Sequence, residues 1–214
     1  MAPRSTTHSG IRMTTSQTPA PLKGSSYWDA RFQEQGFAYG EEPNDFLLSC
    51  APRLTRGKAL SLGEGEGRNA VYLAKLGFEV TAVDFSEVGL QKAQALAQQH
   101  GVQIQCICAD LKDFDMSHES WHLVVSVFSQ PESAVRQRLY GQLSQSLHPG
   151  GAFVLESKVG ADPSGKERYP GLNVLRQEIG PLHLIHAREE ERVLSEGRYH
   201  QGPQRTAQIW AQRN

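Results

Sequence analysis

The stretch that decides the fold of this 214-residue chain reads Leu62-Gly63-Glu64-Gly65-Glu66-Gly67-Arg68-Asn69. Its three alternate glycines follow a short apolar run and lead into a segment with the apolar spacing of a helix. Glycine accepts positive φ values and lets a ligand lie directly against the main chain. A turn of this kind between a strand and a helix is where open α/β sheets bind nucleotide-like ligands. The stretch therefore predicts an α/β sheet with a ligand site at its first turn.

Two carboxylates in this turn narrow the class of ligand. Glu64 and Glu66 bring negative charge to a helix N-terminus, where a pyrophosphate would otherwise bind the free N–H groups. A cationic nucleoside suits the turn better. S-adenosylmethionine is such a ligand, because it has no phosphate and carries a sulfonium and an α-ammonium. Methyl transfer is therefore the leading hypothesis for the function.

Composition favours one α/β domain. The chain is 38% hydrophobic and 21% charged, and its length suits one well-filled domain. The formal net charge of -1 gives no general attraction to nucleic acid or to an anionic membrane. Three cysteines stand in no zinc-binding pattern, so we expect no metal and a reducing, cytoplasmic location. We expect a soluble monomer or weak homodimer that acts on a small molecule.

Residues 1–26 differ in composition from the rest of the chain. They are rich in Ser, Thr and Pro, and no acidic residue precedes Asp29. Such a composition cannot build a core. We expect a disordered N-terminal extension, with an organelle-targeting peptide as the alternative, and a single domain over residues 27–214.

Strand-like and helix-like segments alternate after residue 57. We expect strands at 58–62, 79–83, 102–108, 121–128 and 152–155, and helices at 69–76, 87–100 and 132–147. This alternation predicts a parallel sheet with right-handed crossovers and helices on both faces. Later, a short helix at 172–179 precedes strands at 182–186 and 206–211, which we expect to form an antiparallel hairpin. The charged run 188–192 between them is expected to be mostly a solvated face.

Acidic residues follow the second and third predicted strands. Asp84 stands 21 positions after Gly63, close to the offset at which an acid accepts both ribose hydroxyls of a nucleoside. Ser86 then caps the next helix. Asp110 is placed to accept the adenine amino group, with Leu111 against the ring. Because these loops meet at the carboxyl edge of the sheet, they predict one shared site.

Aromatic residues flank the predicted site. The segment 27–40 precedes the first strand, and it either closes one end of the sheet or forms a lid with Tyr39 over the ligand. Phe128 and Gln130 follow the fourth strand and are expected to line the pocket.

These motifs together resemble the class I S-adenosylmethionine-dependent methyltransferases. The resemblance rests, in this order, on the glycine turn, Asp84, Ala109-Asp110-Leu111 and His148-Pro149-Gly150-Gly151. Further motifs look like the branch related to tellurite-resistance and thiopurine methyltransferases. They are Tyr27-Trp28-Asp29-Ala30-Arg31-Phe32, Tyr39-Gly40 with Pro43-Asn44, Gly65-Glu66-Gly67-Arg68-Asn69, and Glu196-Gly197-Arg198-Tyr199-His200.

The resemblance covers the chain from Tyr27 onward and implies a Rossmann-like, seven-stranded, mostly parallel sheet of order 3-2-1-4-5-7-6. It also implies S-adenosylmethionine as the cofactor. The residues expected at the cofactor are Tyr39, Gly63, Glu64, Gly65, Gly67, Arg68, Asn69, Asp84, Phe85, Ser86, Asp110, Leu111, Val127 and Phe128.

One position departs from the family pattern. Many class I members have an acid two positions before the first glycine, where this chain has Ser61. Glu64 either holds the methionine ammonium in its place or merely faces solvent.

A sulfonium methyl is already activated, so the protein mainly has to align the reactants in a dry pocket. A soft acceptor such as a thiol needs little help from a base, whereas an oxygen or nitrogen acceptor needs one. His200 is the candidate base and Arg198 its anion-recognising neighbour, although both also fit a polar surface turn.

Two other functions remain open. A protein that binds S-adenosylmethionine without catalysis would show the same motifs. An NAD-type oxidoreductase shares the fold, but the acidic turn speaks against it, as does Arg68 where the dinucleotide pattern has its third glycine.

Overall fold

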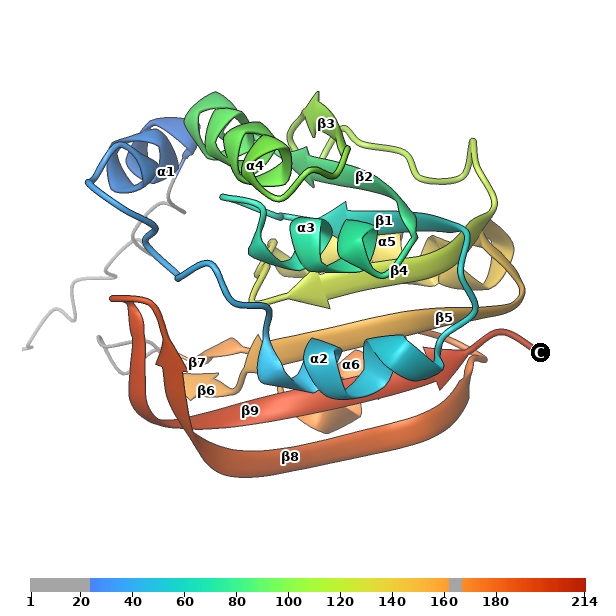
Figure 1. Ribbon diagram of the computed structural model, residues 1–214. Helices are drawn as coiled ribbons and strands as arrows, with labels where there is room; N and C mark the ends of the chain where they lie inside the picture. The colour runs from blue at the N-terminus through green and yellow to red at the C-terminus, as the bar shows by residue number, and fades with distance from the viewer. Residues whose placement is uncertain (1–23, 162–166) are drawn as a thin grey trace, which may run out of the picture.

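The computed structural model describes residues 24–161 and 167–214, so the predicted extension lies almost wholly outside the described residues. A seven-stranded sheet has the order β3-β2-β1-β4-β5-β9-β8 (Figure 1). Strands β1 to β5 are parallel, whereas β9 runs antiparallel to both β5 and β8. This is the predicted order, with β8 and β9 as its sixth and seventh strands. The bounds are β1 Lys58–Leu62, β2 Glu79–Asp84, β3 Gln105–Cys108, β4 Trp121–Val127, β5 Leu147–Lys158, β8 His183–Glu196 and β9 His200–Gln212. A separate pair is formed by β6 Gly160–Ala161 and β7 Glu167–Tyr169.

Helices cover both faces of the sheet, as the alternation predicts (Figure 1). One face carries α2, α3 and α4, and the other carries α5 and α6. The helix bounds are α1 Ser25–Phe32, α2 Asp45–Cys50, α3 Arg68–Lys75, α4 Glu87–Gln99, α5 Ser133–Ser146 and α6 Leu172–Glu178, with a 3₁₀ turn at Ala51–Arg53. The Ser86 hydroxyl accepts a hydrogen bond from Gly89 N at 3.1 Å, so its predicted role as the cap of α4 is confirmed. None of the helices in the described ranges is long and apolar enough to be a membrane span.

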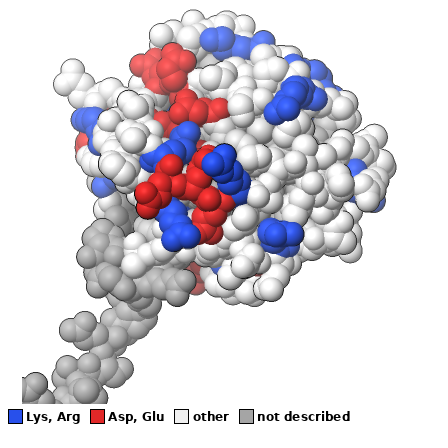
Figure 2. Space-filling model, turned by 90° about the horizontal axis from the view of Figure 1, so that it is seen from below, with Lys and Arg blue, Asp and Glu red and all other residues white. Residues whose placement is uncertain are grey.

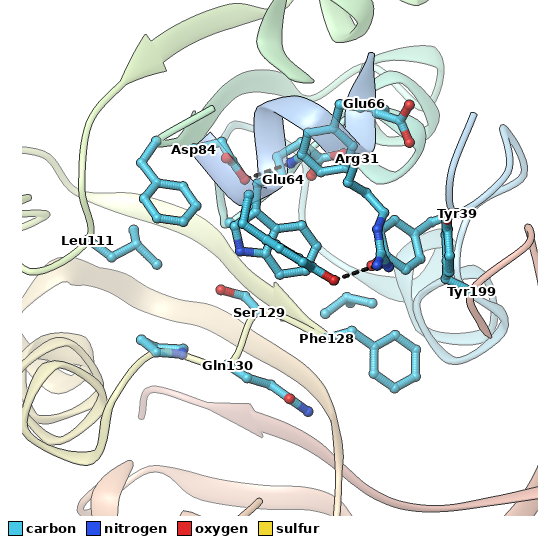
Figure 3. Close-up of a pocket in the computed structure, with 18 of the residues that line it drawn as sticks. Arg31, Tyr39, Glu64, Glu66, Asp84, Leu111, Phe128, Ser129, Gln130 and Tyr199 are labelled. Atoms are coloured by element: carbon cyan, nitrogen blue, oxygen red, sulfur yellow. Dashed lines mark hydrogen bonds between the residues drawn. The ribbon is translucent and has the colours of Figure 1, made fainter. Parts of the chain in front are cut away.

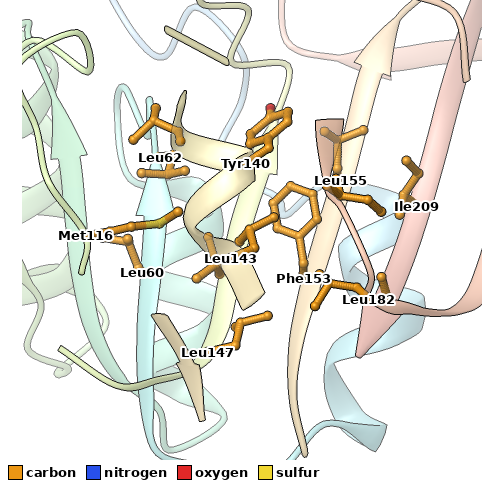
Figure 4. Packing of buried hydrophobic residues seen from close by; sticks show 14 of the residues in the cluster. Leu60, Leu62, Met116, Tyr140, Leu143, Leu147, Phe153, Leu155, Leu182 and Ile209 are labelled. Atoms are coloured by element: carbon orange, nitrogen blue, oxygen red, sulfur yellow. The ribbon is translucent and has the colours of Figure 1, made fainter. Parts of the chain in front are cut away.

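The central strands are buried on both faces, which explains their nearly continuous apolar sequence. In β4, Val124 belongs to the core cluster under α5, whereas Leu123 and Val125 belong to the cluster under α3. Figure 4 shows Tyr140 and Leu143 of α5 packed toward the sheet on the first of these faces. The core therefore fixes the position of the strand ends from which the loops emerge.

The C-terminal hairpin is much longer than predicted. Its strands have 14 and 13 residues, whereas the expected strands cover 182–186 and 206–211. Strand β9 pairs with β5 from Thr206 onward, and the rest of the hairpin continues beyond β5. Strand β8 lies at the edge of the sheet and exposes much of its surface, so many of its residues are charged. Its sequence therefore lacks the apolar pattern that predicts a strand.

Charged side chains along the hairpin form ion pairs with one another, so this surface carries both signs of charge. Ion pairs join Arg188 to Glu190 at 3.2 Å and Arg205 to Glu189 at 2.7 Å. Seen from below, acidic and basic side chains are interleaved (Figure 2). Arg192 is an exception to the mostly solvated run 188–192, because its side chain is only 16% exposed and lies among buried polar groups.

The glycines at the two ends of α3 allow a matched test of packing. Gly67 has φ +96°, and a Cβ there would lie 2.6 Å from the Cα and Cβ atoms of Ala93 in α4. Gly77 has φ +90°, and a Cβ there would meet nothing within 4 Å. We expect Gly77→Ala to lower the free energy of unfolding by about 1–2 kcal/mol, the cost of the left-handed backbone. Gly67→Ala should cost a further 1–3 kcal/mol or so, because the two helices must separate. Urea unfolding measures both losses, and equal losses would contradict the close packing of α3 on α4.

Candidate functional site

A cavity of about 630 Å³ opens at the carboxyl edge of the parallel strands, on the side where the tip of the β8–β9 hairpin also lies (Figures 1 and 3). Loops after β1, β2, β3 and β4 line it, together with α1 and the hairpin. The structure brings most of the predicted residues together there: Tyr39, Gly63, Glu64, Gly65, Arg68, Asn69, Asp84, Phe85, Asp110, Leu111, Val127, Phe128 and His200. Gly67, Ser86 and Arg198 are not among its lining residues.

The glycine turn leaves no room for side chains. Gly63 and Gly65 have φ values of +65° and +66°. A Cβ on Gly63 would overlap the side chain of Ser129, and one on Gly65 would lie 3.1 Å from Cζ of Phe32. The turn is thus held between the loop after β4 and helix α1, with its main chain facing the cavity.

Glu64 is buried, which excludes the alternative that it faces solvent. Its Oε1 accepts hydrogen bonds from the N–H groups of Asn69 and Ala70, each at 3.0 Å. Ser61 Oγ donates to Oε2. Burial raises the pKa of Glu64, while these donors favour its charged form. The carboxylate therefore satisfies two N–H groups in the first turn of α3, and the hydrogen bond from Ser61 orients it.

Asp84 is fixed at the tip of β2. Only 6% of the residue is exposed. The carboxylate accepts hydrogen bonds from Gly65 N at 2.9 Å and from Ser86 N at 2.8 Å. Burial raises its pKa to about 6. Its neighbour Ser86 donates to Asp29 at 2.5 Å as well as capping α4, which explains why Ser86 does not line the cavity.

Asp110 is more open than Asp84. Its side chain is 41% exposed, and it accepts a hydrogen bond from Lys112 N at 2.9 Å. Leu111 lies beside it in the cavity wall (Figure 3).

His200 is held between two aromatic rings. The centroid of its imidazole is 4.4 Å from that of Phe128 and 4.6 Å from that of Tyr39. Burial lowers the pKa of His200, and the nearby Lys158 and Arg68 lower it further, whereas Glu196 opposes them. The imidazole is therefore neutral at pH 7 and able to accept a proton.

Phe128 has φ +51°, which is unusual for a residue with a side chain. Its N–H donates to the carbonyl oxygen of Glu156 at 2.7 Å. Strained backbone of this kind gathers at functional sites.

Arg198, predicted beside His200, points elsewhere. Its Nη2 donates to the carbonyl oxygen of Gln35 at 2.9 Å and lies 3.2 Å from a carboxylate oxygen of Glu34. The side chain is about half exposed. The turn at 197–199 directs it toward the N-terminal segment and away from the cavity.

Helix α1 supplies lining residues that the sequence did not assign to the site. Tyr27, Trp28 and Arg31 all line the cavity. The Arg31 guanidinium lies 3.6 Å from the ring centroid of Tyr199, and Arg31 also donates to the hydroxyl of Tyr27. Since Tyr39 lines the cavity too, the structure favours the lid alternative for segment 27–40. The aromatic and basic residues before the first strand were the available signal.

Two further lining residues, Lys158 and Tyr169, come from the end of β5 and from β7. No sequence motif marked either of them.

The cavity fits S-adenosylmethionine by its size, its bare glycine backbone and its acidic side. A volume of 300–1,000 Å³ is usual for small-ligand sites. Glu64, Glu66 and Asp84 lie together on one side of it (Figure 3). Within the described ranges, His, Cys, Asp and Glu side chains form no group that could hold a metal ion.

Comparison with known proteins agrees with this geometry. Residues 59–151 match a family model described as a methyltransferase domain. No curated protein matches the sequence at a significant level. The domain match indicates a methyltransferase, and the solved structures show that the fold is shared.

Solved structures share the fold at low sequence identity. The chain is similar to a protein described by the conversion of a disulfide bond into a thioacetal group during echinomycin biosynthesis, with a TM-score of 0.69, 16% identity and coverage of 89% of this chain and 93% of that chain. It is similar to TehB from Haemophilus influenzae, with a TM-score of 0.68, 17% identity and coverage of 89% and 67%. It is also similar to the N-methyltransferase NodS from Bradyrhizobium japonicum, with a TM-score of 0.61, 15% identity and coverage of 79% and 93%.

The role of Glu64 inside the protein can be tested by an isosteric change. The Glu64→Gln substitution replaces one carboxylate oxygen, which accepts hydrogen bonds in the native protein, by an amide NH₂ group that faces the same donors and cannot accept from them. We expect the free energy of unfolding to fall by about 1–3 kcal/mol. Glu87→Gln, an exposed acid in the first turn of α4, is the matched control and should cost about 0.5 kcal/mol. Urea unfolding of both variants decides the matter, and a loss for Glu64→Gln no larger than the control's would contradict the capping role.

Proposed function

Because residues 59–151 form a methyltransferase domain, we propose that this protein methylates a small-molecule acceptor with a soft nucleophilic atom, such as a thiol, a chalcogen or an arsenic species. The observation that carries the proposal is the cavity itself, which joins an acidic glycine turn to a wall of aromatic rings and a neutral imidazole. The proposal includes the branch related to tellurite-resistance and thiopurine methyltransferases. The similarity to TehB supports that branch, and the sulfur chemistry named for the echinomycin protein supports a soft acceptor.

The residues on the acidic side hold the cofactor. Asp84 accepts the ribose hydroxyls, for which its two backbone donors hold it in place. Asp110 and Leu111 receive the adenine. Gly63 and Gly65 let the methionine part lie against the main chain. When bound, S-adenosylmethionine supplies a methyl group already activated by the positive sulfur.

The remaining lining residues align the acceptor and exclude water. Trp28, Tyr39 and Phe128 give the wall its aromatic surface. A dry, shaped wall favours a displacement chiefly by fixing the approach of the acceptor. A thiol needs little more, because it ionises near neutral pH. His200 accepts the proton of an acceptor that does not ionise so readily.

Location and assembly form part of the same proposal. The cysteine usage favours a reducing, cytoplasmic environment. Residues 27–214 act as one domain, in a monomer or weak homodimer.

Titration calorimetry followed by an acceptor screen tests the function. We expect micromolar binding of S-adenosylmethionine and no comparable binding of NADH. The screen covers thiols, oxyanions of the heavier chalcogens, arsenite and small phenols, with S-adenosylhomocysteine as the readout. Failure to bind S-adenosylmethionine would overturn the proposal. Binding without S-adenosylhomocysteine from any acceptor would favour a non-catalytic binding protein.

His200→Ala separates the two kinds of acceptor. We expect thiol methylation to change by less than about threefold, since a thiol loses its proton unaided. Methylation of a phenol should fall about 100-fold or more, the usual contribution of a positioned base. His118→Ala, at an exposed position outside the cavity, is the control and should change neither rate. Equal losses for thiol and phenol would argue that His200 shapes the pocket and does not accept a proton.

A further inference from the structure

Three buried nitrogen atoms in the cavity wall have no hydrogen-bond partner among the described residues. They are Nη1 of Arg68, Nε2 of Gln130 and Nδ1 of His200. A buried polar atom without a partner is energetically costly, so such atoms call for an explanation. Nδ1 of His200 lies 4.0 Å from a carboxylate oxygen of Glu196. The nitrogens of Arg68 and Gln130 are therefore the two that indicate a missing ligand group that accepts hydrogen bonds.

Arg68 is the most deeply buried of the three side chains and carries a fixed charge. Its side chain is 8% exposed, and Nη2 donates to Glu196 Oε2 at 2.6 Å. One arm of the guanidinium is thus paired, while the other lacks a partner. Guanidinium groups match the geometry of carboxylates particularly well.

Arg68 and His200 lie around one carboxylate, because the Glu196 oxygen that pairs with Arg68 Nη2 at 2.6 Å is 4.0 Å from His200 Nδ1. Gln130 and Phe128 lie across the cavity from Asp84 and Glu66 (Figure 3). The Phe128 ring contacts His200, and Lys158 also lines this part of the wall. This part of the cavity is therefore rich in donors, with Lys158 as a cation and Arg68 paired to Glu196.

The carboxylates on the acidic side already have partners and do not compete for these donors. Glu64 and Asp84 accept backbone hydrogen bonds, and Glu66 accepts one from Ala38 N at 2.7 Å and pairs with Lys92. Glu132, an exposed acid on the rim, also lines the cavity.

We propose that the methyl acceptor is a small thiol that also carries a carboxylate, and that Arg68 and Gln130 bind this carboxylate. The inference rests on the proposed methyltransferase function and names its substrate class. In the reaction the thiol loses its proton to solvent, and its sulfur forms a new bond to the methyl carbon. The bond from that carbon to the sulfonium sulfur breaks, and its electron pair stays on the departing sulfur.

Three thiols of equal length but different charge test the proposal. They are 3-mercaptopropionate, 3-mercaptopropan-1-ol and 3-aminopropane-1-thiol, compared by kcat/KM at one pH with S-adenosylhomocysteine as the readout. We expect the anionic thiol to exceed the neutral one by about 10-fold or more, the usual effect of a charged hydrogen bond. The cationic thiol should be the poorest. Equal values, or a preference for the neutral or cationic thiol, would overturn the inference while leaving methyl transfer intact.

Substitutions locate the recognition. Gln130→Glu turns a donor into an acceptor of the same shape and should abolish the preference for the anionic thiol. Gln137→Glu makes the same change of charge on the exposed face of α5 and should leave the preference unchanged. Arg68→Lys keeps a cation for Glu196 but lacks the second donor arm, and it should reduce the preference about 10-fold. A preference that survives both cavity variants would contradict the assignment.

A binding measurement keeps this inference separate from the proposed activity. The protein, with and without S-adenosylhomocysteine, is titrated with 3-(methylthio)propionate and with 3-(methylthio)propan-1-ol. Tighter binding of the anion supports the carboxylate site even if no thiol is methylated, in which case the proposed activity fails alone. Equal binding or none overturns the site.

Discussion

The buried ion pair between Arg68 and Glu196 is the interaction on which the site depends. It joins the first residue of α3 to the last residue of β8, 128 positions apart in the sequence. Asn44 donates to Glu196 at 3.0 Å and to Glu156 at 2.6 Å, and Arg192 contacts both of these acids. Burial alone would raise the pKa of Glu196, but its partners lower it to about 2. A buried charge is tolerated only with such partners, so the glycine turn, β5 and the hairpin must assemble together.

This network explains why the hairpin continues beyond the sheet. Pairing of β5 with β9 ends at Lys158 and Thr206, but β8 and β9 go on to pair Glu196 with His200. The extra length brings His200 to the cavity and Glu196 to Arg68. The hairpin tip is then held by the N–H of Arg198, which donates to Ala38 O at 2.9 Å. The side chain of Glu156 belongs to the network, and its carbonyl oxygen accepts a hydrogen bond from Phe128 N, the residue with positive φ.

Local patterns predict the sheet and much of the cavity wall. The glycine turn, the acid at the tip of β2 and the cap at Ser86 each depend on residues close in sequence, so strand order and the cofactor side follow from them. The orientation of Glu64 is also set locally, by Ser61, Asn69 and Ala70, although the sequence left it open. The burial of Arg192 depends on contacts with distant segments. Arg31 and Lys158 reach the cavity for the same reason, and no motif marks them. Arg198 shows the converse error, because a turn of a few residues decides which way its side chain points.

The two sides of the cavity differ in how their polar groups are satisfied. On the acidic side, backbone N–H groups and Lys92 satisfy the carboxylates within the protein, so the negative charge there is fixed in position. On the opposite side, Arg68 and Gln130 keep nitrogens without partners. A ligand group that lacks hydrogen-bond acceptors would leave those nitrogens unsatisfied, and that cost would oppose its binding. In the proposed function, selection among acceptors acts through hydrogen bonding at one end of the cavity, while the fixed carboxylates at the other end suit a cationic nucleoside.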